Sequence, residues 1–229
     1  MKADLALLAN ECRIILRYRI ALAALFALGG YAAIFELGID RISADTAAFL
    51  IFSDPSMLGL AFAGLLVMVE REQGADFQMF TAGASRLRRF GWRATVIGAL
   101  ALLVSAVLAS AFANVADWPA FLTTGFAISM TYSAIGMAVA LRIQRMTAFF
   151  AVAGICVLSI YFSMALALGL GPMGKLWPFL LQFEALRCAL GAGSAPDLVL
   201  SGATAVSVLY AVIALWASAN LGGRRLSPG

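Results

Sequence analysis

Hydropathy divides this chain into long apolar runs separated by short polar stretches. A helix needs about 20 predominantly apolar residues to cross roughly 30 Å of hydrocarbon. We predict a membrane-spanning helix in each of six runs, at about residues 20–39, 46–69, 94–115, 120–141, 146–170 and 198–221. The predicted fold is therefore an all-α, polytopic membrane protein in which residues 1–229 form a single transmembrane domain.

The first polar stretch, residues 1–19, carries an amphipathic pattern. At about 100° per residue, Leu8 and Ile15 fall on one side of a helix while Arg13 and Arg17 fall on the far side. A helix of this kind lies in the membrane interface with its apolar side toward the lipid. The alternative is a plain cytosolic extension of the first span.

Two connections between the spans also have predictable structure. Residues 116–119 include Asp117 and Pro119, a tight-turn composition, so the third and fourth spans should form an antiparallel hairpin. Residues 171–197 contain an apolar stretch that polar side chains interrupt and that is too short for a comfortable crossing. We expect one or two short helices there at the outer face, and the pattern leaves open whether they re-enter the membrane.

The basic residues predict the orientation of the chain. Thirteen of its 16 Lys and Arg residues fall in four stretches on one side of the predicted spans, and the other three, Arg41, Lys175 and Arg187, fall on the opposite side. Cytoplasmic connections collect Lys and Arg. We therefore expect a multi-pass protein of the inner (plasma) membrane with both termini in the cytoplasm.

Composition agrees with a lipid environment and excludes several classes of function. The chain is 63% hydrophobic and only 12% charged, about half the charge that a water-soluble domain carries. It has no histidine, which removes Ser/His/Asp catalysis and histidine-ligated haem, and no GxxxxGK[ST] loop, which removes ATP hydrolysis by a P-loop. The basic residues that give the chain its net charge of +4 lie beside apolar spans. Attraction to anionic membrane lipid predicts this placement, so we do not expect a nucleic-acid partner. We expect no catalytic, metal or cofactor site on this chain.

Two acidic residues inside predicted spans are candidates for a pathway or a helix interface. Asp54 precedes Pro55 in the outer half of the second span, where an ionisable group is costly unless it faces protein or water. The alternative is that the helix starts later, with Asp54 as its N-cap and Pro55 as its first residue. Glu36, near the outer end of the first span, fits either a contact with a transported molecule or an ordinary pairing with Arg41.

The longest polar connection, residues 70–93, differs from a simple solvated loop. It starts with an acidic, glycine-broken corner and ends with a cluster of Arg residues. Between them lie apolar side chains that need a surface to pack against, and the groove of a cytosolic partner would provide one. The residues expected to couple the chain to this partner are Glu70, Arg71, Glu72, Gly74, Phe77, Phe80 and Thr81.

These features resemble the membrane subunit, or permease, of ABC exporters of the type-2 superfamily. In that family an amphipathic helix precedes the first span, and the second span ends in an E-x-E-x-G-like corner followed by a short coupling helix, often with a Thr-Pro pair. Glu70, Glu72 and Gly74 match the corner, Thr81 matches the Thr, and Ala82 stands where Pro is usual. Within the superfamily the chain is most similar to small drug-export permeases, including those of fluoroquinolone export.

The resemblance implies that two permease chains, identical or different, pair with two ABC ATPase subunits that hold the ATP and Mg²⁺. It also implies that residues 70–90 dock on the ATPase and that the complex exports a small, amphipathic molecule. Two other classes of function stay open: a proton-coupled secondary carrier that uses Asp54, and a membrane assembly scaffold. A membrane enzyme ranks third, because no constellation of nucleophile, base or metal ligands is visible.

Overall fold

The computed structural model describes residues 2–36, 44–73, 86–113, 115–167 and 180–191, together with residues 205, 208–209, 211–214 and 216. Every regular element within these residues is an α-helix. The helices are α1 (Lys2–Arg17), α2 (Ile20–Glu36), α3 (Ala44–Glu72), α5 (Arg86–Phe112), α6 (Trp118–Arg142), α7 (Met146–Ala167) and α8 (Leu180–Ala189). The prediction of an all-α fold is confirmed for the part of the chain that is described.

Three of these helices are long and apolar enough to cross a membrane. By length and composition the qualifying segments are Asp45–Glu72, Leu87–Ala111 and Trp118–Arg142. Shorter apolar helices occupy Ile20–Gly30 and Met146–Phe162. These helices indicate a membrane protein. The sixth predicted span, residues 198–221, lies largely outside the described residues.

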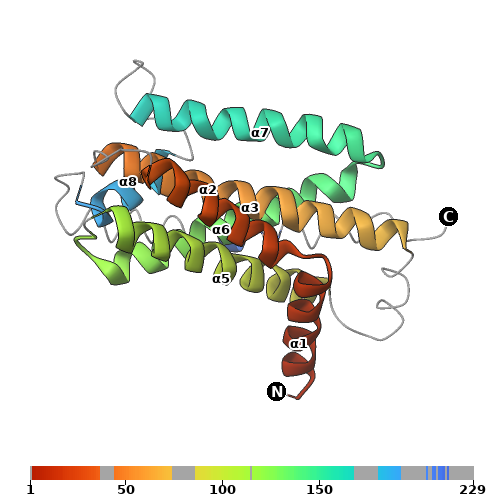
Figure 1. The fold of residues 1–229 in the computed structure, drawn as a ribbon. Coiled ribbons are helices and arrows are strands. Elements are labelled where there is room, and N and C mark those ends of the chain that lie inside the picture. Colours follow the sequence, from red (N-terminus) through yellow and green to blue (C-terminus); the bar gives the residue numbers. More distant parts are fainter. Residues whose placement is uncertain are drawn as a thin grey trace.

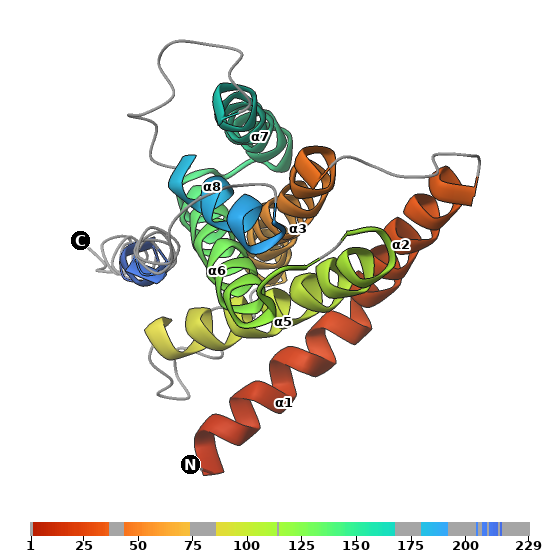
Figure 2. The same ribbon diagram turned by 90° about the vertical axis from the view of Figure 1, so that its left-hand side faces the viewer.

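Helices α3, α5 and α6 pack against one another and form the centre of the bundle (Figure 1). Helix α2 lies against α5, and α7 lies against α3 on another side of the bundle (Figure 2). Helices α1 and α8 lie at opposite ends of the bundle in Figure 1, and we call these the α1 end and the α8 end. The last turn of α3 and the first turns of α5 lie at the α1 end, so the connection between them leaves and returns there.

Glycines allow α3 and α6 to approach closely. A Cβ atom added to Gly136 would lie 2.1 Å from the carbonyl oxygen of Leu60, and one added to Gly59 would lie 2.8 Å from that of Ser129. Neither position accepts a side chain unless a helix moves. Small residues permit this kind of close contact between membrane helices. Gly154 of α7 differs, because an added Cβ would meet no other part of the described structure within 4 Å.

The connection between α5 and α6 is fastened to α8. Asp117 caps α6, since its Oδ1 atom accepts a 3.0 Å hydrogen bond from the amide of Ala120, and Pro119 lies in the first turn. The amides of Ala116 and Asp117 both donate to the carbonyl oxygen of Ala189, the last residue of α8, at 3.0 and 3.1 Å. The third and fourth predicted spans thus form the hairpin that the sequence indicates.

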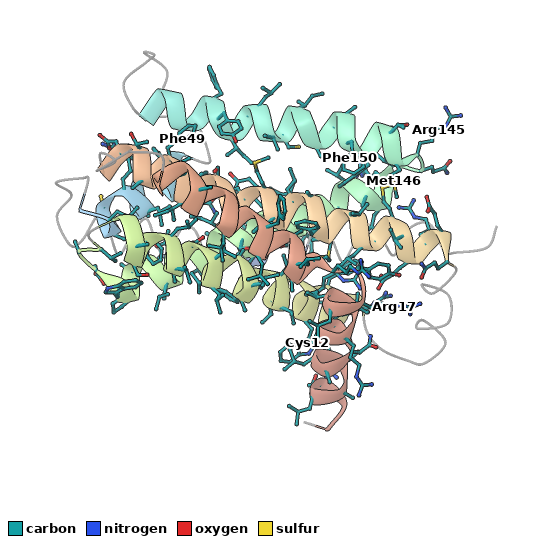
Figure 3. The ribbon with its side chains drawn as sticks, viewed as in Figure 1. Cys12, Arg17, Phe49, Arg145, Met146 and Phe150 are labelled. Atoms are coloured by element: carbon teal, nitrogen blue, oxygen red, sulfur yellow. The ribbon has the colours of Figure 1, made fainter. Side chains whose placement is uncertain are left out.

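Helix α1 crosses the α1 end at a steep angle to the long helices (Figure 1). Ile15 is buried against the bundle, whereas Leu5 and Leu16 are exposed and form a second apolar side. Cys12 and Arg17 leave α1 on different sides (Figure 3). The predicted amphipathic helix is therefore present, but its apolar arc is divided between a side that packs on protein and a side that is available to lipid.

Two helices extend into the polar connection that the sequence predicts between the second and third spans. The sequence assigns residues 70–93 to a cytosolic connection, but α3 continues to Glu72 and α5 already begins at Arg86. Among the charged residues near these helix ends, Glu70, Arg89 and Arg93 are buried in the bundle, whereas Glu72 and Arg88 are exposed. Hydropathy does not show which of these residues are buried, because it counts an Arg as polar whether its charge faces water or a buried carboxylate.

Candidate functional site

Four ionised side chains meet at the α1 end, and we call Glu11, Glu70, Arg89 and Arg93 the ion cluster. Glu11 comes from α1, Glu70 from the last turn of α3, and the two arginines from the first turns of α5. Arg89 and Arg93 are four residues apart, so they share one face of α5. The cluster therefore joins three helices.

Arg93 is the centre of the ion cluster. Its Nη2 and Nη1 atoms lie 2.6 and 2.8 Å from Oε1 and Oε2 of Glu70. Its Nε and Nη2 atoms lie 2.9 and 3.2 Å from Oε2 and Oε1 of Glu11. One guanidinium thus holds two carboxylates through paired hydrogen bonds, a geometry that the planar Arg side chain allows and a Lys ammonium does not. Arg89 donates a further bond from Nη2 to Oε2 of Glu70.

The ion cluster is buried and electrically balanced. The Arg93 side chain is 0% exposed, that of Glu11 1% and that of Glu70 5%. Two positive and two negative charges cancel, so no net charge is buried. Removing one partner would leave an uncompensated charge, which costs about 3 to 5 kcal/mol. The cluster therefore fixes α1, α3 and α5 in one arrangement.

The neighbouring residues of α3 make further bonds at the α1 end. Arg71 donates from Nη1 to the carbonyl oxygen of Ile143 at 2.9 Å, and from Nη2 to that of Ala140. These carbonyls belong to the C-terminal end of α6, where a cation complements the helix dipole. The Oε1 atom of Gln73 accepts a 2.9 Å bond from the hydroxyl of Tyr18, which lies between α1 and α2. The last turn of α3 is thus bonded to its surroundings on several sides.

The structure brings three predicted coupling residues together at the end of α3, in different environments. Glu70 is buried in the ion cluster, so it positions helices and is not itself a docking surface. Arg71 is half-buried against α6, and Glu72 is exposed. The other predicted coupling residues, Gly74, Phe77, Phe80 and Thr81, lie outside the described residues.

The predicted pathway residues are placed only through the backbone. Helix α3 runs from Ala44 to Glu72 without interruption, so Asp54 lies inside a helix and is not the cap of one that starts later. Its neighbours Ser53 and Ser56 are buried and donate to backbone carbonyls of the preceding turn at 2.7 and 2.8 Å. The side chains of Asp54, Pro55 and Glu36 lie outside the described part of the chain.

Sequence reasoning missed Glu11, Arg89 and Arg93 as site residues. It counted both arginines as cations of a cytosolic connection and gave Glu11 no role. The sequence did contain an indication that Glu11 faces protein, because it occurs between the apolar positions Leu8 and Ile15 of an amphipathic helix. What the sequence does not contain is the pairing itself, since Glu11 and Arg93 are 82 positions apart.

The ion cluster offers no group that could transform a substrate, because its carboxylates and guanidiniums are engaged with one another. Across the described ranges no three His, Cys, Asp or Glu side chains are placed to hold a metal ion. What the cluster provides is a rigid junction of helices. Comparison of the chain with models of protein families, with curated proteins and with solved structures finds no match in any of the three.

Proposed function

We propose that this chain is the membrane permease of an ATP-driven exporter of the ABC type-2 kind and works with a separate ATPase. The observation that supports it most is the ion cluster, which ties the amphipathic helix α1 to both helix ends that bracket residues 74–85. In such an exporter a force that the ATPase applies to this segment must reach the spans. A junction of buried, paired charges transmits a displacement, because separating the partners costs several kcal/mol.

The proposal includes the topology. Six spans at the predicted positions put the α1 end, both termini and residues 74–85 on the cytoplasmic side of the inner membrane. Two observations agree with this orientation: the exposed Arg17 and Arg145 both lie at the α1 end (Figure 3), and Arg187 lies at the α8 end. The exposed apolar side of α1 would then lie in the cytoplasmic membrane interface.

The proposal also assigns the parts that this chain does not supply. ATP and Mg²⁺ bind to the ATPase subunits, and a second permease chain, identical or different, completes the pathway. The exported molecule is small and amphipathic. Glu72, exposed at the end of α3, is the described residue best placed to touch the ATPase.

A second candidate function is a proton-coupled carrier. One observation favours it: Asp54 lies within the continuous helix α3, next to two buried serines. A carboxylate inside a membrane helix can serve as a proton site. Asp54→Asn separates the two functions, because it abolishes transport in vesicles that have a proton gradient and no ATP only if the chain is a carrier.

Co-purification tests the permease proposal. A tagged full-length chain is extracted from its native membrane in mild detergent, and the proteins that remain bound are identified by mass spectrometry. We expect an ATPase with a P-loop, and less of it when Glu72→Lys reverses the exposed charge. Thr123→Lys, an exposed position at the start of α6, is the matched control and should leave recovery unchanged. A parental preparation without any P-loop ATPase contradicts the proposal.

A further inference from the structure

Helix α8 is too short to cross a membrane and nevertheless packs inside the bundle. Its ten residues reach about 15 Å, half of the hydrocarbon thickness. Gln182, Phe183 and Leu186 are 0% exposed, and α8 contacts α3, α6 and α7. It therefore occupies space between the long helices at the α8 end (Figure 2).

Three aromatic rings from three helices meet at this helix, and we call Phe52, Tyr132 and Phe183 the aromatic triad. Phe52 of α3 lies edge-on to Phe183 of α8, with the ring centroids 5.3 Å apart, and edge-on to Tyr132 of α6 at 6.2 Å. All three side chains are buried. Rings in this arrangement offer faces and edges that another aromatic molecule can engage in the same way.

Gln182 directly precedes Phe183 of the aromatic triad, and its side-chain amide is only half satisfied. Its Nε2 atom donates to Oγ1 of Thr131 at 3.3 Å, and this hydroxyl in turn donates to the carbonyl oxygen of Ala127 at 2.8 Å. Its Oε1 atom is buried and accepts no hydrogen bond within the described residues. A buried acceptor without a donor is destabilising, and native proteins keep few of them. The Gln182 oxygen is therefore suited to an incoming N–H or O–H group.

Much of the polar attachment of α8 lies where water reaches it. Arg187 lies with Nη2 2.7 Å from Oδ1 of Asp45 and with Nη1 3.0 Å from Oε1 of Glu184. The side chains of Asp45 and Glu184 are 45% and 36% exposed. Exposed ion pairs contribute little stability, so these two pairs oppose a shift of α8 only weakly.

We propose that the junction of α3, α6 and α8, formed by the aromatic triad with Gln182 and Thr131, binds a flat aromatic molecule that carries an N–H or O–H donor. The molecule enters as α8 shifts: its ring takes the place of the contact between Phe52 and Phe183, and its donor bonds to Oε1 of Gln182. That this molecule is the exported one rests on the proposed function, whereas the binding itself does not.

Ethidium, a planar aromatic dye with amino N–H donors, is a suitable probe. Its fluorescence is titrated with the purified full-length chain in detergent, without an ATPase. We expect saturable binding that Gln182→Met, which keeps the length of the side chain, weakens about threefold to tenfold by removing one hydrogen bond. Phe183→Leu should weaken it to a similar degree by removing a ring contact. Gln144→Met, the same change at an exposed position between α6 and α7, is the matched control.

Absence of saturable binding to the parental protein overturns the inference. So does binding that Gln182→Met leaves unchanged in a protein with parental helix content. If Phe183→Leu does not fold, Gln182→Met alone decides. If an ATPase co-purifies with the chain but dye binding does not depend on Gln182, this site is refuted and the permease proposal stands. If dye binding depends on Gln182 but no ATPase co-purifies with the chain, this site stands and the permease proposal is refuted.

Discussion

Arg93 of α5 holds Glu70 of α3 through hydrogen bonds of 2.6 and 2.8 Å, across 23 positions that include the whole connection between these helices. The two ends of the connection are therefore fixed to each other. Because Glu11 shares the same guanidinium, α1 is fixed to them as well. A push on the connection would move three helices together.

Arg93→Lys should destabilise the protein even though it preserves the charge. An ammonium cannot form paired hydrogen bonds with Glu11 and Glu70 at once, so we expect the free energy of unfolding to fall by about 2 to 3 kcal/mol. Denaturation of the purified protein in mixed micelles measures this change. Arg88→Lys, the same substitution at a side chain that is 65% exposed, is the control and should cost less than about 0.5 kcal/mol. Equal effects of the two substitutions would show that the paired geometry is not important.

Glu11→Gln should release α1 from the bundle while the long helices stay packed. The change leaves a net positive charge buried between Arg89 and Arg93, and we expect the opening free energy of α1 to fall by about 3 kcal/mol. Limited trypsin digestion checks this, because cleavage after the exposed Arg13 and Arg17 should accelerate. Glu72→Gln, at an exposed carboxylate, should leave the cleavage rate unchanged. If the two variants are cleaved at the same rate, α1 is not held by the ion cluster.

Arg71→Met should loosen the C-terminal end of α6. The side chain donates to the carbonyl oxygens of Ala140 and Ile143, and losing these charge-assisted bonds costs about 1.5 to 3 kcal/mol. Hydrogen exchange of the Ile143 amide, which donates to Val139 at 3.1 Å, should then be at least about tenfold faster. Arg142→Met, at an exposed arginine one position before Ile143, is the control. Unchanged exchange in the Arg71 variant would refute the role of this side chain.

Gly136→Ala should separate α3 from α6. The new methyl group would lie 2.1 Å from the carbonyl oxygen of Leu60, so the helices must shift, and we expect a loss of about 1 to 3 kcal/mol in the free energy of unfolding. Gly154→Ala is a matched control, because its methyl group meets no other part of the described structure within 4 Å. That control should be neutral or slightly stabilising, since Ala favours a helix. A Gly136 variant as stable as the control contradicts the close approach of the two helices.

Arg187→Gln should let α8 open more often. Its bonds to Asp45 and Glu184 are partly exposed, so their loss is worth about 1 kcal/mol, or about fivefold in the open population. Cys188 of α8 is half-buried and in no disulfide, and its alkylation by a maleimide reports this opening once Cys12 and Cys156 are replaced by serine. Arg145→Gln, at an exposed arginine of the α1 end, should not change the rate. An alkylation rate that does not respond to Arg187→Gln would show that these bonds do not restrain α8.

The sequence predicts the long helices of the described ranges well, because such helices depend on long apolar runs, which hydropathy detects directly. The cap at Asp117 was also predictable as a turn, since its chemistry is local. The burial of Arg89 and Arg93 was not predictable, because both read as solvated cations until a buried carboxylate is known to face them.

The residues of the candidate site likewise divide into those that the sequence indicates and those that it does not. The acidic corner at the end of the second apolar run indicated Glu70 and Arg71 as residues that couple the chain to a partner, a role that stays a prediction. In the structure both make long-range bonds within the chain. Glu11 was missed because its partner lies 82 positions away. Gln182 was noticed only as a polar interruption, since periodicity cannot show that its oxygen is buried without a hydrogen-bond donor.

Site-specific cross-linking tests the central proposal most directly. A photoreactive maleimide is attached to Glu72→Cys, in a chain whose native cysteines are replaced by serine, and irradiated in intact native membranes. The permease proposal predicts a cross-link to a P-loop ATPase from this position at the α1 end, and none from Thr123→Cys at the start of α6. A cross-link to the ATPase from Thr123→Cys, or its absence from Glu72→Cys, would contradict the proposal.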